Sequence, residues 1–93
     1  DPAYKDADSL KLLAEVARFV RERGFEIIDV DSVIAAQAPK LSPYREQMRE
    51  NLARAMGLPV ENVGVKATTT EHLGHEGREE GITAYATCLV CRI

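Results

Sequence analysis

The sequence predicts an α+β fold of two layers, with helices packed on one face of a mixed β-sheet, in a single domain over residues 1–93. Three observations support this class. Two segments repeat apolar residues at the three- and four-residue steps of a helix. Three segments are rich in the valine, isoleucine and threonine that strands favour. Their order is helix, strand, helix, strand, strand, and packing the helices on one sheet buries both kinds of apolar face.

The first helix is expected to run from about Ser9 to Gly24. Ser9 or Asp8 can supply the side-chain oxygen of an N-cap, and Gly24 suits the left-handed residue that ends many helices. Apolar side chains recur through the segment at Leu10, Leu13, Val16, Phe19 and Val20. This stripe is the predicted buried face of the helix.

A strand and a second helix are expected next. The segment Phe25 to Gln37 is rich in isoleucine and valine without clean alternation, which favours a strand covered on much of both faces, with a bulge near residues 29–31. Proline removes a backbone donor, so Ala38-Pro39 should end the strand. Ser42 then offers an N-cap, with Pro43 at the first position of a helix that Gly57 closes.

Two further strands complete the expected fold, at Asn62–Ala67 and Ile82–Ile93. The second carries Cys88 and Cys91. Side chains three residues apart in a strand point to opposite faces, so these thiols cannot share one metal. We expect two ordinary buried or half-buried cysteines.

Composition excludes several classes of function. The chain has 45% apolar and 29% charged residues, which is typical of a folded protein. A net charge of −3 and only three tyrosines and two phenylalanines argue against a nucleic-acid surface. No stretch approaches the roughly 18 apolar residues of a membrane span, and the chain opens without a secretory leader pattern. The expected location is the cytoplasm.

A run of polar residues follows the strand predicted at Asn62–Ala67, in VKATTTEHLG at Val65–Gly74. If a helical turn begins within residues 68–70, its free N–H groups can bind an anion. Threonine hydroxyls would donate to a phosphate, and Glu71 would hold a divalent cation between phosphate oxygens. The alternative is structural, with Thr68 or Thr69 capping a helix and Glu71 completing a capping box.

A second tract, AQAPKL at Ala36–Leu41, follows the first predicted strand. Its small residues would let a flat ligand approach the backbone, and Lys40 would neutralise a phosphate. The alternative for Lys40 is a solvated surface position.

Together these segments resemble the 2-C-methyl-D-erythritol 2,4-cyclodiphosphate synthases. The resemblance covers essentially all 93 residues, and AQAPK followed by KATTTE is its most specific part. The matching words are ADS at 7–9, DVD at 29–31, AQAPKL at 36–41, VKATTTE at 65–71, LG at 73–74 and GREEGI at 77–82.

The resemblance implies a phosphorus–oxygen lyase of isoprenoid precursor synthesis, in the methylerythritol phosphate route. In that family the 2-phosphate of 4-diphosphocytidyl-2-C-methyl-D-erythritol 2-phosphate attacks the β-phosphorus, expels CMP and closes a cyclic diphosphate. Positioning and charge neutralisation supply most of such catalysis. The cytidine pocket would be lined by Ala36, Gln37, Ala38, Pro39, Lys40, Leu41 and Ser42.

The same resemblance implies roles for the other substrate-binding residues. Thr69 would stabilise the transition state, and Glu71 would ligate magnesium or manganese at the diphosphate. Arg78 would lie near a three-fold axis, close to Glu80. The remaining expected substrate contacts are Asp1, Ala67, Thr68, Thr70 and His75.

The resemblance also implies a homotrimer with active sites between neighbouring subunits, and a zinc ion. The zinc ligands of the family, an Asp-x-His pair and a further histidine, are expected in a segment before Asp1, outside this sequence. His72 and His75 are therefore expected to be exposed loop residues. The family has phenylalanine at the position of His75 and glycine at that of Glu79.

Three interpretations of the chain follow. It is the C-terminal part of a working synthase, or a catalytically silent module that binds CMP or supports assembly without zinc. The third is a small interaction domain with no ligand.

Overall fold

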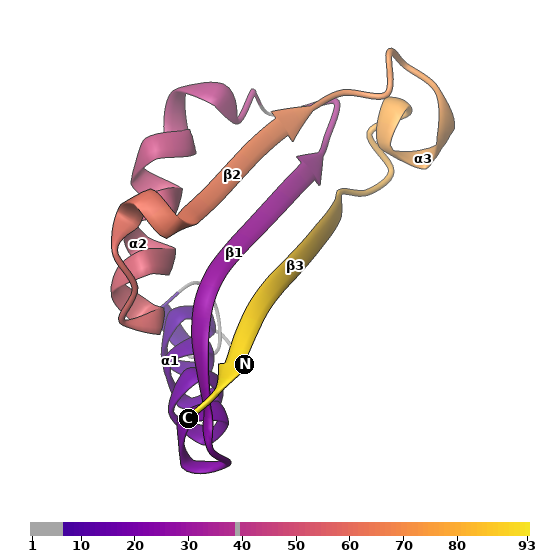
Figure 1. Ribbon diagram of the computed structural model, residues 1–93. Coiled ribbons are helices and arrows are strands. Elements are labelled where there is room, and N and C mark those ends of the chain that lie inside the picture. Colours follow the sequence, from indigo (N-terminus) through magenta and orange to yellow (C-terminus); the bar gives the residue numbers. More distant parts are fainter. Residues whose placement is uncertain (1–6, 39) are drawn as a thin grey trace.

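The computed structural model describes residues 7–38 and 40–93. The order helix, strand, helix, strand, strand is confirmed, with a short third helix before the last strand (Figure 1). The main elements are α1 (Ala7–Glu22), β1 (Phe25–Ala35), α2 (Arg45–Met56), β2 (Val63–Thr68), α3 (Gly74–Gly77) and β3 (Thr83–Arg92). Two single 3₁₀ turns, η2 (Ser42–Tyr44) and η3 (Val60–Asn62), precede α2 and β2.

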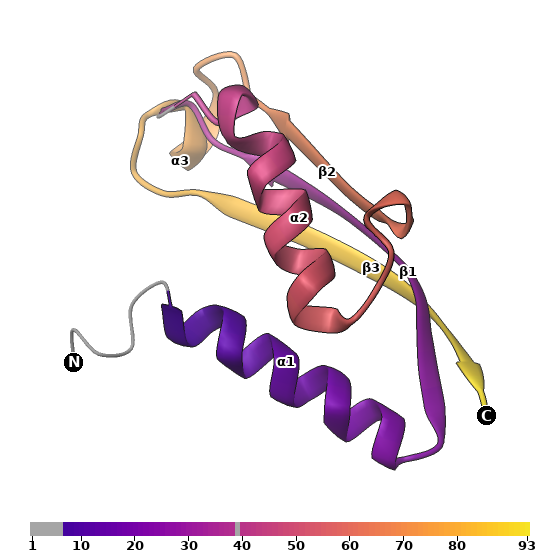
Figure 2. The same cartoon turned by 90° about the vertical axis from the view of Figure 1, so that its left-hand side faces the viewer.

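The three strands form one mixed sheet in the order β2-β1-β3. The central strand β1 runs parallel to β2 and antiparallel to β3. Figure 2 shows α1 and α2 side by side on the same face of this sheet. The predicted α+β architecture of two layers is thereby confirmed.

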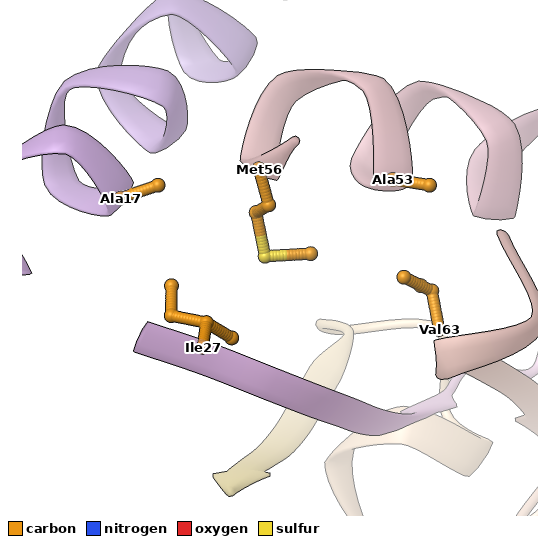
Figure 3. Close-up of a cluster of buried hydrophobic side chains, with 5 residues drawn as sticks. All are labelled: Ala17, Ile27, Ala53, Met56 and Val63. Atoms are coloured by element: carbon orange, nitrogen blue, oxygen red, sulfur yellow. The ribbon is translucent and has the colours of Figure 1, made fainter. Parts of the chain in front are cut away.

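The core lies between the two helices and the strands β1 and β2. Met56 extends from α2 into the layer between helices and sheet, toward Ile27 and Val63 (Figure 3). Met56 is 4% and Val63 1% exposed. Ala17 of α1 and Ala53 of α2 complete the buried cluster, and their short side chains let the helices approach the sheet closely.

The predicted buried face of α1 is partly wrong. Val16 and Phe19 are 56% and 53% exposed, whereas the buried side of the helix is centred on Ala17, between Leu13 and Val20. Helix α1 packs against α2 and β1 along one narrow side only. Periodicity identified the apolar side of the helix but not how wide a surface would cover it.

The helix starts also differ from those predicted. Helix α1 begins at Ala7, so Asp8 and Ser9 lie inside it rather than at its N-cap. Ser42 is not the N-cap of α2, because the turn η2 begins there and α2 starts at Arg45. Gly57 closes α2 as predicted, with φ +70°, a conformation that glycine adopts without strain.

The bulge of β1 is at Ile28, one residue before the predicted place, since the register with β3 shifts between Ile27 and Asp29. The prediction that both faces of β1 are covered is wrong: Glu26, Asp29 and Asp31 are exposed. The helices cover one face of the sheet, and these side chains extend away from the core.

The prediction for the cysteines is also wrong, because Cys88 and Cys91 are both free and exposed. They lie on β3, where every residue after Thr83 is exposed. The helices pack on β1 and β2, so neither face of β3 is buried to the degree that its apolar sequence suggested.

Among residues 7–38 and 40–93, no helix is long and apolar enough to cross a membrane.

Candidate functional site

The two tracts singled out in the sequence meet at one edge of the sheet. Strands β1 and β2 are parallel, so their carboxyl ends lie together, where ligands of such sheets commonly bind. The register pairs Ile34 with Ala67 and Ala35 with Thr68. One residue further, the Ala36 N–H donates to the Thr68 carbonyl at 3.0 Å. Segments 36–42 and 67–71 therefore start side by side, although about thirty residues separate them in sequence.

A pocket of about 350 Å³ lies at this edge. Its volume falls at the lower end of the range for small-molecule sites, roughly 300–1,000 Å³. Alanine, leucine and proline make its apolar part, and Lys40, Thr68 and Thr69 supply polar groups. The lining residues are Ala36, Gln37, Lys40, Leu41, Ser42 and Pro43 from the β1 side, and Ala67, Thr68 and Thr69 from β2.

The threonine tract does not start a helix, so both sequence interpretations of it, the anion-binding helical turn and the capping box, are wrong. Residues 70–73 instead form a tight turn, in which the Leu73 N–H donates to the Thr70 carbonyl at 3.1 Å. Its central residues Glu71 and His72 have φ of 55° and 65°, as in a type I′ turn. Left-handed residues cannot continue a right-handed helix, and α3 begins only at Gly74.

The hydroxyl groups of the tract stabilise this turn. Thr69 Oγ1 accepts a hydrogen bond from the Glu71 N–H at 3.3 Å. The Thr70 hydroxyl donates to the Leu73 carbonyl, and Thr68 Oγ1 donates to the Thr69 carbonyl at 3.3 Å. The run of polar side chains thus shapes the backbone that leaves the pocket.

Two residues from other segments contact the turn. Gln37 Oε1 accepts a hydrogen bond from the His72 N–H at 3.1 Å. On α3, Gly77 is buried so close that a Cβ there would lie 2.2 Å from the His72 carbonyl carbon. The turn that carries Glu71 is therefore in contact with Gln37, which lines the pocket, and with Gly77 of α3.

Glu71 itself is exposed on this turn and does not line the pocket. In the part of the chain that the structure describes, no three His, Cys, Asp or Glu side chains gather closely enough to hold a metal. Magnesium commonly takes one or two carboxylates and leaves its other positions to phosphate and water. A single carboxylate is compatible with that ion where a ligand supplies the other oxygen atoms.

His75 and Arg78 lie on α3 and beside it, beyond the pocket. Both predicted loop histidines are exposed, His72 on the turn and His75 in α3. Arg78 Nε donates to Glu80 Oε1 at 2.8 Å, so the expected proximity of these two residues is confirmed.

A small polar cluster joins α3 to the start of β3. Thr83 Oγ1 donates to Glu76 Oε2 at 2.5 Å, and His75 Nε2 lies 3.1 Å from Thr83 Oγ1 and 3.2 Å from Glu76 Oε2. The hydrogen bond from Thr83 is the main cause that lowers the pKa of Glu76 below its ordinary value of 4.5. The backbone of Glu76 and the charges of His75 and Arg78 act in the same direction.

Not every predicted site residue takes part in the pocket. Asp1 and Pro39 lie outside the described residues, and Ala38 is exposed next to the pocket without lining it. Pro43 lines the pocket but was missed, although its place directly after AQAPKLS could have suggested it. The sequence predicted no role for Gly77 beyond its place in the GREEGI motif, and its neighbours in sequence do not predict a contact with His72.

A larger pocket of about 430 Å³ lies at the free edge of β2, lined in part by Asp29, Asp31, Arg45, Glu46 and Arg49. Its arginine Arg49 donates to the Val63 and Val60 carbonyls at 2.7 and 2.8 Å and pairs with Glu46 at 3.0 Å. The guanidinium therefore satisfies edge carbonyls of the chain itself. The smaller pocket is the better candidate for a nucleotide.

Comparisons with known proteins show the family of this chain. The sequence model of the YgbB family matches residues 1–91. A relative from Desulfitobacterium hafniense, named 2-C-methyl-D-erythritol 2,4-cyclodiphosphate synthase, is 58% identical over 91 residues, which are 97% of this chain and 58% of that protein. The chain thus spans less than three fifths of the length of this curated relative.

Solved structures show the same relationship. The crystal structure of 2C-methyl-D-erythritol 2,4-cyclodiphosphate synthase from Plasmodium vivax superposes with a TM-score of 0.87 and 33% identity, over 91% of this chain and 57% of that one. A structure of the synthase in a CDP-bound form gives a TM-score of 0.80 and 30% identity, over 98% and 58% of the two chains. The resemblance found in the motifs is thereby confirmed, and the chain belongs to the YgbB family, alongside relatives named 2-C-methyl-D-erythritol 2,4-cyclodiphosphate synthase.

Proposed function

We propose that this chain carries the cytidine and diphosphate site of a 2-C-methyl-D-erythritol 2,4-cyclodiphosphate synthase. The observation that carries the proposal is the pocket where residues 36, 37 and 40–43 meet residues 67–69 at the ends of two parallel strands. The names of the relatives support it, as does the CDP bound in a structure of similar fold. The proposal includes a cytoplasmic setting in isoprenoid precursor synthesis.

The proposed reaction is an intramolecular phosphoryl transfer. An oxygen of the 2-phosphate of 4-diphosphocytidyl-2-C-methyl-D-erythritol 2-phosphate attacks the β-phosphorus and forms a new P–O bond. The bond from that phosphorus to the oxygen shared with CMP breaks, and its electron pair leaves with CMP. The products are CMP and the cyclic diphosphate, so the enzyme is a phosphorus–oxygen lyase. Such transfers depend on positioning and on stabilising charge at the phosphoryl oxygens.

The pocket offers groups suited to each part of the substrate. The small side chains of Ala36 and Ala67 leave room for a flat base to contact the backbone. Lys40 is exposed at the pocket and neutralises phosphate as a point charge. The Thr69 hydroxyl accepts from the Glu71 N–H and keeps its own proton for donation. Directed at the β-phosphate, that proton stabilises the charge that gathers there in the transition state.

Glu71 would hold magnesium or manganese, which when bound neutralises charge between the phosphates. Zinc is different, because it requires several protein ligands and the described residues provide no such set.

A homotrimer is also part of the proposal. Large apolar side chains, among them Tyr85 and Leu89 of β3 and Leu12 of α1, are exposed on the single chain. Exposed apolar side chains of this kind are common where subunits meet.

Two substitutions test the proposed roles, with Lys66→Ala as control because Lys66 is exposed on β2 outside the pocket. Lys40→Ala should weaken CMP affinity about tenfold, the loss expected for one hydrogen bond to a charged group. Thr69→Ala should lower turnover by the whole protein about a hundredfold, as when one oxyanion donor is removed, with little change in CMP affinity. Titration calorimetry and steady-state kinetics measure both.

Unchanged CMP affinity in Lys40→Ala would remove Lys40 from the pocket. Equal losses of affinity and turnover in Thr69→Ala would exclude its transition-state role. CMP binding without turnover by the whole protein would favour the catalytically silent binding module instead.

A further inference from the structure

The turn at Thr70–Leu73 has a backbone conformation that its own sequence does not favour. Glu71 and His72 both have positive φ, and neither is the glycine or asparagine that adopts this region readily. Such conformations persist where the surrounding structure holds them, and they gather at functional sites. The contacts around the turn therefore determine where Glu71 lies.

Gln37 supplies the contact from the pocket side. Its Oε1 accepts the His72 N–H at 3.1 Å, across 35 residues of sequence. Gln37 is half-buried and lines the pocket, directly after Ala36, whose N–H is bonded to the Thr68 carbonyl. These two hydrogen bonds connect Ala36 and Gln37, directly after β1, to Thr68 and to the turn at His72.

Gly77 supplies a contact from α3. Its N–H donates to the Leu73 carbonyl at 3.1 Å, and its lack of a side chain lets α3 lie directly against His72. Loss of the Gln37 bond would remove the contact that ties the turn to the pocket.

We infer that Gln37 is a positioning residue. It holds the turn so that the Glu71 carboxylate stays next to Thr69, which the proposed function directs at the β-phosphate. The inference rests on the proposed function, because it gives Glu71 a metal and diphosphate to meet. It differs from a direct substrate contact, because the bond it invokes lies within the protein, from the His72 N–H to the amide oxygen of Gln37. Gln37 would therefore affect the diphosphate end of the ligand rather than the base.

The test compares Gln37→Met, which removes the acceptor from a side chain of similar length, with Gln37→Glu, which keeps an acceptor oxygen. Gln47→Met is the matched control, since the Gln47 amide donates to Asn51 Oδ1 on the exposed face of α2, at 3.0 Å. Gly77→Ala displaces the turn by a second route, because its Cβ would overlap the His72 carbonyl carbon.

Amide exchange is measured first, by NMR on the ligand-free chain. In Gln37→Met the His72 amide should exchange about fivefold faster than in the wild type, the ratio expected for one hydrogen bond. Gln37→Glu and Gln47→Met should retain the wild-type rate. Equal rates in Gln37→Met and the wild type would overturn the inference.

Affinities for CMP and for CDP with Mg²⁺ are measured next. Gln37→Met and Gly77→Ala should each weaken CDP binding about fivefold and change CMP affinity by less than about twofold. Equal losses for both nucleotides would overturn the inference, since Gln37 would then act on the base or on the whole pocket. Failure of the wild type to bind either nucleotide would refute the proposed function, while the exchange rate would still support or overturn the role of Gln37 in the turn.

Discussion

The two sides of the central strand β1 differ in what covers them. On one side β1 pairs with the parallel strand β2, where Val63 and Val65 are buried beneath α2. On the other it pairs over ten positions with the antiparallel strand β3, where Leu89 is 60% exposed. Backbone pairing extends along both sides, with one bulge at Ile28 on the side of β3, so hydrogen bonding alone does not decide where the core forms.

The connection between the strands accounts for the difference. Parallel neighbours need a crossover, and a helix in that crossover packs back on the strands it joins. Helix α2 lies in the connection between β1 and β2 and buries Met56 against them. An antiparallel partner brings no such helix, and the link before β3 contains only the four-residue α3. The parallel side therefore holds both the core and, at its strand ends, the pocket.

The largest effect is expected from substitution on the covered side. Met56→Ala should lower the free energy of unfolding by about 2–5 kcal/mol, since it removes a buried side chain and leaves a cavity. Leu89→Ala on β3 should change it by about 0.5 kcal/mol or less in the single chain, as for an exposed position, and by more where subunits of the proposed trimer meet on β3. Urea denaturation of both variants measures the comparison. Losses of similar size would show that β3 is covered by a partner in solution.

A smaller effect is expected where β3 is tied to the rest of the molecule. Thr83, the only half-buried residue of β3, donates to Glu76 and lowers the pKa of that carboxyl. A lowered folded-state pKa means that the stabilisation is fully present above the unfolded value of 4.5 and is lost as pH falls through the folded value.

Thr83→Val should therefore be less stable than the wild type at neutral pH, by less than Met56→Ala. The difference should shrink as the pH falls below 4.5 and Glu76 becomes protonated. Unfolding free energies measured across this range, with Thr87→Val on the exposed part of β3 as control, check the prediction. A difference independent of pH would exclude the Thr83–Glu76 bond as its cause.

Much of this comparison could be predicted from the sequence. The order of elements followed from periodicity and from glycine at the end of α2, and the two polar tracts were placed at strand ends that then proved to be neighbours. Periodicity could not predict how much of each apolar face would be covered by other elements of the fold. Val16, Phe19 and Cys88 are apolar in sequence but exposed in the single chain, because burial depends on elements that pack from elsewhere.

The threonine tract shows a second limit. Thr68 and Glu71 have the spacing of a capping box, and local sequence alone favours a helix start. The structure has a left-handed turn instead, held by Gln37 and Gly77, which lie 35 and 5 residues away from His72. The Gln37 contact is tertiary, and the tract's own sequence does not predict either contact.

The most direct test of the central claim is an NMR titration of the chain with CMP, followed through backbone amide shifts. The largest changes are expected at the pocket between the parallel strand ends, at Ala36, Lys40 and Thr68, with little change at the larger pocket around Asp31 and Arg45. Largest changes around Asp31 and Arg45, or no saturable change anywhere, would contradict it.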